Sequence, residues 1–146
     1  MRSDNSSSAG SIRALSIGLV VVGLIFTVGL YPLTRLWPAG FAWGHGSSHY
    51  LAMILGVYAT LGVFLLLAAR DPLANRSLIW FTVASSVVHA VIMAVQAVGD
   101  PAERGHLAGD VPALLLVAAG LAVLLHRAEH HPHAEQLSGG CARGGG

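Results

Sequence analysis

The sequence predicts an all-α membrane protein, a bundle of four antiparallel transmembrane helices. Only 10% of the 146 residues are charged and 54% are hydrophobic, whereas a soluble domain carries about a quarter charged residues. Four apolar segments also approach the roughly 20 residues that a helix needs to cross a bilayer. These segments are residues 14–33, 50–69, 77–98 and 111–126.

The first segment, residues 14–33, contains no Asp, Glu, Lys or Arg. It is longer than the apolar core of a cleavable signal peptide, which spans about 7–15 residues, and it runs into Tyr31 and Pro32 rather than a small-residue cleavage site. We therefore expect a retained helix. Before it, residues 1–11 are expected to form a disordered polar tail, outside a membrane domain of residues 12–127.

The second and third segments, residues 50–69 and 77–98, are joined by a short polar link. Pro72 disfavours helical geometry at Asp71, so the second helix is expected to end there. Asn75 is a suitable N-cap for the third helix. Because the link is short, the two helices are expected to be antiparallel neighbours.

The fourth segment is the shortest, because its apolar run covers only residues 111–125. Such a helix would rise about 22 Å, so it is expected to span by including His126 or the residues that precede it. Asp110 is a suitable N-cap, and Pro112 is tolerated in the first turn. Residues 128–146 are expected to form a His- and Gly-rich flexible tail.

Pairs of small residues four positions apart let two membrane helices approach closely. Ala52 with Gly56, and Ala118 with Ala122, form such pairs. We expect helix contacts at both.

The third segment carries a polar stripe that a helix does not need in order to span. At 100° per residue, Thr82, Ser85, His89 and Gln96 fall within about 60° of one another, with Met93 just beside them. They must face protein or water, because lipid offers them no partner. The stripe, centred on His89, is a candidate surface for a small ligand. For His89 itself, the favoured interpretation is a structural hydrogen bond to a neighbouring helix, at Tyr58 or Thr60. The stripe consists of Thr82, Ser85, His89, Met93 and Gln96.

A second group of side chains is expected at the outer membrane boundary. Residues four apart share a helix face, so His106 with Asp110, together with His45 and His49, form a candidate metal or proton-handling site. The alternative is that these histidines lie among lipid headgroups and that Asp110 only caps its helix. The sequence identifies no cofactor.

Three segments together resemble a family of small bacterial four-helix membrane proteins of unknown function. They are residues 37–43, 70–77 and 105–110. The resemblance covers residues 12–127 and implies the same four-helix topology without an assigned activity. The arrangement is more loosely similar to the DoxX-like four-helix membrane proteins, a likeness of fold alone.

Three functions are compatible with these patterns. The favoured one is a membrane protein that binds a small ligand or serves as an accessory subunit; the alternatives are a small proton-coupled carrier and a His-dependent metal or redox enzyme. We expect no catalytic residue, because the spans carry no nucleophile elbow, phosphate loop or paired carboxylates. The expected partners are the lipid bilayer and a second copy or another membrane subunit. Nucleic acid is excluded, because no basic cluster occurs.

We predict a multi-pass protein of the bacterial inner membrane with both termini in the cytoplasm. Arginines concentrate on the cytoplasmic side of membrane proteins, and six of the eight lie in the termini and in the link between helices two and three. A reporter that is active only in the periplasm should be inactive at Gly146 and active within residues 39–47. Activity at Gly146 would refute the orientation. The six are Arg2, Arg13, Arg70, Arg76, Arg127 and Arg143.

Overall fold

The computed structural model describes residues 3–41 and 49–130, and that part of the chain contains helices and no strand. Four helical stretches are long and apolar enough to cross a membrane, which confirms the all-α fold class. Large apolar side chains such as Val57, Val98 and Leu116 are 69–74% exposed, as expected where lipid replaces water. The stretches are Ala9–Leu36, Leu51–Ala68, Arg76–Gly99 and Pro101–His130.

The first span combines three helical elements without a break. The α-helix α1 (Ser3–Leu24) passes into a five-residue π-helix, η1 (Ile25–Gly29), and then into α2 (Leu30–Leu36). The helix begins at Ser3, inside the segment 1–11 that we expected to be a polar tail. π-Helical turns are rare and occur often at functional sites, and η1 lies beside the cavity described below.

The second span, α4 (His49–Ala68), packs against α1 and η1. The two backbones meet at Gly62 and Gly23: a Cβ atom added to Gly62 would lie 2.7 Å from the Gly23 carbonyl oxygen. That same carbonyl accepts a 2.7 Å hydrogen bond from Thr27 Oγ1. The pair expected from the sequence, Ala52 with Gly56, is exposed instead, and nothing lies within 4 Å of a Cβ atom added to Gly56.

The third span, α5 (Arg76–Gly99), follows a short link at residues 69–75 and packs mainly on α6 (Asp110–His130). Asn75 occupies the N-cap position of α5, as expected, but its side chain makes no cap hydrogen bond. Its Nδ2 donates to the Asp71 carbonyl oxygen at 2.9 Å and thereby closes the link.

The fourth helix is longer than its apolar run. α6 has 21 residues, begins at Asp110 and continues to His130, through the first residues of the segment 128–146 that we expected to be a flexible tail. A 3-10 helix, η2 (Pro101–Leu107), precedes it. The short helix α3 (Pro38–Phe41) packs on η2.

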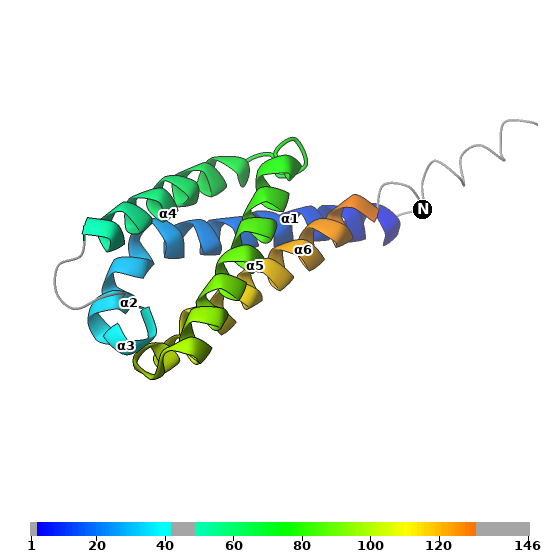
Figure 1. The fold of residues 1–146 in the computed structure, drawn as a ribbon. Helices are drawn as coiled ribbons and strands as arrows, with labels where there is room; N and C mark the ends of the chain where they lie inside the picture. Colours follow the sequence, from blue (N-terminus) through cyan, green and yellow to red (C-terminus); the bar gives the residue numbers. More distant parts are fainter. Residues whose placement is uncertain (1–2, 42–48, 131–146) are drawn as a thin grey trace, which may run out of the picture.

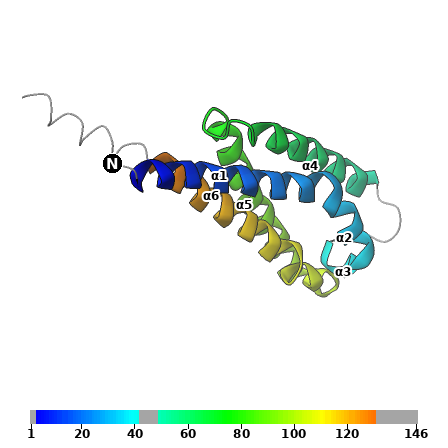
Figure 2. The ribbon, with the colours of Figure 1, turned by 180° about the vertical axis from the view of Figure 1, so that it is seen from behind.

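The larger buried core joins the second half of α1 and the second half of α6 to the ends of α4 and α5 that the residue 69–75 link connects (Figure 1). From this end α4 and α5 diverge, and they contact each other only weakly. Figure 2 shows α1 running across the bundle, with α4 on one side and α6 on the other. The core includes Leu15, Leu19, Leu65, Ile79, Leu121 and Leu125.

We predict that Gly62→Val lowers the free energy of unfolding by about 2 kcal/mol, because the new side chain must separate α1 from α4. Gly56→Val is the matched control, since it makes the same change on α4 in open space. It should alter the free energy by less than about 0.5 kcal/mol. Thermal unfolding of both variants in detergent would measure the difference, and equal effects would contradict the close contact.

Candidate functional site

The divergence of α4 and α5 leaves a cavity of about 570 Å³ between the spans. This is within the range of small-molecule sites, about 300–1,000 Å³. Its walls come from η1, α2, α3, α4, α5 and α6 and are mostly apolar. The polar side chains on its walls are Thr34, Tyr58, His89, Gln96 and Asp110.

The cavity opens sideways rather than only toward the membrane surface. Ile25, Ile92 and Leu116 line it, and they are 39%, 51% and 74% exposed. All three lie within membrane-spanning stretches. A molecule dissolved in the bilayer would therefore meet the opening directly.

The structure divides the polar stripe of α5 into two parts. His89, Met93 and Gln96 line the cavity. Thr82 is buried, and its Oγ1 donates to the Leu78 carbonyl oxygen at 2.9 Å. Ser85 Oγ donates to the Thr82 carbonyl oxygen at 3.2 Å. The hydroxyls of Thr82 and Ser85 thus bond to their own helix, whereas the other three side chains form a surface that a ligand would contact.

His89 packs against an aromatic side chain from the opposite wall. The rings of His89 and Tyr58 meet edge to face with centroids 5.6 Å apart. Tyr58 in turn meets Phe26 of η1 at 5.0 Å, also edge to face. Such pairs favour one relative placement of their helices. The row Phe26–Tyr58–His89 therefore connects η1, α4 and α5 across the cavity, although α4 and α5 themselves scarcely touch.

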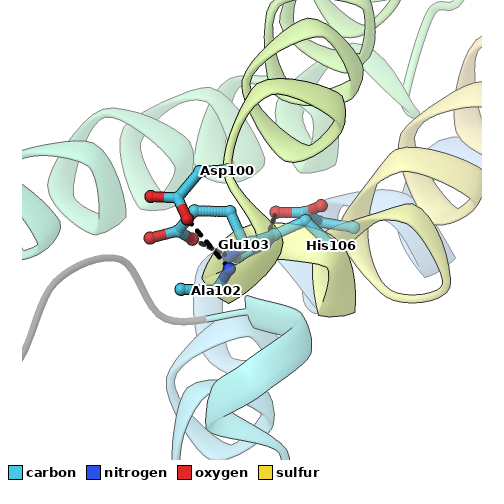
Figure 3. Close-up of polar contacts among 5 residues, drawn as sticks. Asp100, Ala102, Glu103 and His106 are labelled. Atoms are coloured by element: carbon cyan, nitrogen blue, oxygen red, sulfur yellow. Dashed lines mark hydrogen bonds and ion pairs between the residues drawn. The ribbon is translucent and has the colours of Figure 1, made fainter.

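His106 of η2 is the buried polar centre of the site, with 1% of its surface exposed. Its Nε2 lies 3.0 Å from Glu103 Oε2, and its Nδ1 lies 2.9 Å from Asp110 Oδ2. A 3-10 helix has three residues per turn, so Glu103 and His106 lie on the same face. Figure 3 draws both side chains beside Asp100, which accepts a 2.9 Å hydrogen bond from the Ala102 amide and caps η2.

The 3-10 helix η2 packs closely against α3. A Cβ atom on Gly105 would overlap the carbonyl group of Ala39. The absence of a side chain at Gly105 therefore lets the two short elements approach each other closely.

Asp110 belongs both to the histidine cluster and to the cavity. Its Oδ2 contacts His106, while its Oδ1 is buried and has no hydrogen-bond partner among the described residues. Asp110 is also close enough to Tyr58 and His89 for its charge to act on both. Asp110 stands at the start of α6, where we expected an N-cap, and its side chain also connects η2 to the cavity wall.

The candidate metal site is only partly assembled. His106 and Asp110 are in contact, as their spacing predicts, but both ring nitrogens of His106 face carboxylates. His49 is exposed at the start of α4, and His45 lies outside the described residues. Among residues 3–41 and 49–130, no three His, Cys, Asp or Glu side chains are grouped to hold a metal ion.

Sequence reasoning missed two members of the site. Glu103 escaped notice because only spacings of four residues were considered, whereas η2 aligns residues three apart. Phe26 looked like any apolar residue of a span. Tyr58 and Thr60 were both named as hydrogen-bond partners for His89. The structure places the Tyr58 ring against the His89 ring, whereas the Thr60 hydroxyl donates to the Gly56 carbonyl oxygen.

One comparison with known proteins gave a match. Residues 9–138, most of the chain, match the model of a family described as "Family of unknown function (DUF6632)". This confirms the resemblance to a family without an assigned activity. No curated protein and no solved structure matches the chain.

We predict that His106→Ala lowers the free energy of unfolding by about 3 kcal/mol, because it leaves two carboxylates without their shared partner. The control is His49→Ala, on an exposed histidine of the same part of the molecule. It should change the free energy by less than about 0.5 kcal/mol. Thermal unfolding in detergent compares the two, and a stable His106→Ala protein would show that the cluster contributes little.

Proposed function

We propose that this chain, which belongs to the DUF6632 family, is a membrane protein that binds a small amphipathic ligand in the cavity between α4 and α5. The observation that carries the proposal is the cavity itself. It combines a long apolar wall with a few polar groups, and it opens at the level of the spans. That combination is typical of sites for molecules with one polar end.

The packing of the bundle favours binding over transport. The leucine core fills the bundle where the residue 69–75 link lies, so the cavity occupies only the part of the bundle away from that link. A carrier would need a continuous polar path, whereas Thr82 and Ser85 bond to their own helix. An enzyme that uses histidine-bound metal is less well supported, because His106 is already paired on both sides.

We also propose the finer location of the protein. The arginine distribution supports the bacterial inner membrane with both termini in the cytoplasm. The cavity and η2 then lie in the outer half of the bilayer. A second copy or a partner membrane subunit remains part of the proposal, because many apolar side chains of α5 face outward.

We predict that filling the cavity abolishes binding of a neutral amphipathic probe, 1-dodecanol, to the detergent-purified chain. Ala113 lines the cavity, whereas Ala119 is exposed on the same helix. Ala113→Phe should weaken binding at least tenfold, and Ala119→Phe should leave it unchanged. Retention of isotope-labelled dodecanol measures both. Equal retention by the two variants, or none by the wild type, would refute the cavity as a binding site.

A second variant tests the role of His89 in the same assay. His89→Leu removes the polar ring from the cavity wall and should weaken dodecanol binding several-fold. The free energy of unfolding should fall by about 1–2 kcal/mol at most, because buried polar contacts in membranes contribute little. Val87→Leu, on an exposed side of α5, should change neither quantity. Unchanged binding by His89→Leu would remove His89 from the site.

A further inference from the structure

The chemistry of the ligand's polar end follows from one unsatisfied atom. Asp110 Oδ1 is buried, lacks a partner among the described residues, and belongs to a side chain that lines the cavity. A buried acceptor without a donor is unfavourable by about 1–3 kcal/mol, and by more when it is charged. The site is therefore completed by a molecule that brings an N–H or O–H group to Asp110.

The net charge of the Glu103–His106–Asp110 cluster indicates whether the donor group of the ligand is neutral or positively charged. The contacts of His106 with Glu103 and Asp110, at 3.0 and 2.9 Å, each require a proton between nitrogen and oxygen. One of the two protons lies on a ring nitrogen of His106. The other lies either on the second ring nitrogen, which gives a charged ring beside two carboxylates, or on one carboxyl group, which gives a neutral ring beside one carboxylate. In both arrangements the three groups together carry a net charge of −1.

This negative charge is only partly exposed to solvent. The side chain of Glu103 is 26% exposed, but those of Asp110 and His106 are only 13% and 1% exposed. A net charge in such surroundings is unfavourable unless a counter-charge lies nearby. Among the described residues, Asp110 forms its ion pair with His106, and no arginine pairs with it. The cavity beside Asp110 is the place where a positive charge would balance it.

We infer that the ligand is an amphiphile with a protonated amine, whose ammonium group donates to Asp110 Oδ1 while its apolar chain fills the cavity. This inference rests on the proposed binding function and specifies its substrate class. Tyr58, Phe26 and Phe41 line the same cavity, and aromatic rings attract cations. The remaining wall is aliphatic, as a hydrocarbon chain requires.

Three twelve-carbon probes that differ only at the polar end test the inference. Unlabelled dodecylammonium, 1-dodecanol and dodecanoate would compete with labelled dodecylamine for the full chain in a non-ionic detergent. We expect dodecylammonium to compete at concentrations at least tenfold below dodecanol, and dodecanoate to be the weakest. Equal competition by all three would overturn the inference, and so would a preference for dodecanoate. This comparison needs only the wild type.

Asp110→Asn removes the charge at the same position and should reduce the preference for dodecylammonium over dodecanol to about twofold or less. Asp100→Asn is the matched control, because Asp100 is an exposed acid that caps η2 outside the cavity. The Asp100→Asn protein should keep the full preference for dodecylammonium over dodecanol. A folded Asp110→Asn protein that still prefers dodecylammonium would overturn the assignment of Asp110.

The two proposals fail in different ways. Dodecanol binding that Ala113→Phe abolishes, without any preference for the ammonium, would refute this inference and leave the proposed function standing. Failure of every probe to bind would refute both.

Two sources of such a ligand are distinguished by native mass spectrometry with added lipids. Retention of phosphatidylethanolamine over phosphatidylglycerol, lost in Asp110→Asn, would identify an amine lipid of the bilayer. Specific binding of dodecylammonium without retention of that lipid would identify a free amphiphilic amine. Both results support the inference.

Discussion

The contact between α1 and α4 at Gly23 and Gly62 is the constraint on which the rest of the arrangement depends. With no side chain at Gly62, α4 lies against the first span. α5 is held instead by α6, so the helices on either side of the short link separate as they leave it. The cavity is the space that this separation leaves, and the row Phe26–Tyr58–His89 spans it at one level.

The cluster around His106 has a complementary role at the other end of α4 and α5. It connects η2 to the first turn of α6, and α3 packs on η2. Because Asp110 belongs to the cluster and also lines the cavity, the charges of η2 and the electrostatics of the cavity are coupled. A change at Glu103, outside the cavity wall, would alter the charge that the cavity presents.

The fold class and the four spans could be predicted from the sequence, since composition and the length of apolar runs determine whether a helix can cross a bilayer. The helical period also identified which side chains of α5 share a face. It could not show which helix that face meets, so Thr82 and Ser85 were grouped with His89 although their hydroxyls bond to their own helix. The close contact of α1 with α4 at Gly23 and Gly62 was also missed, because Gly62 belongs to neither of the small-residue pairs that the sequence pointed to.

The sideways opening of the cavity determines how affinity for the proposed ligand would have to be expressed. A molecule that enters past Ile92 and Leu116 comes from the hydrocarbon phase, where an amphiphile accumulates far above its aqueous concentration. Occupancy then depends on the mole fraction of ligand among lipids, not on its molarity in water. A weak intrinsic dissociation constant would suffice for saturation in the cell, and dilution with extra lipid would empty the site at constant total ligand.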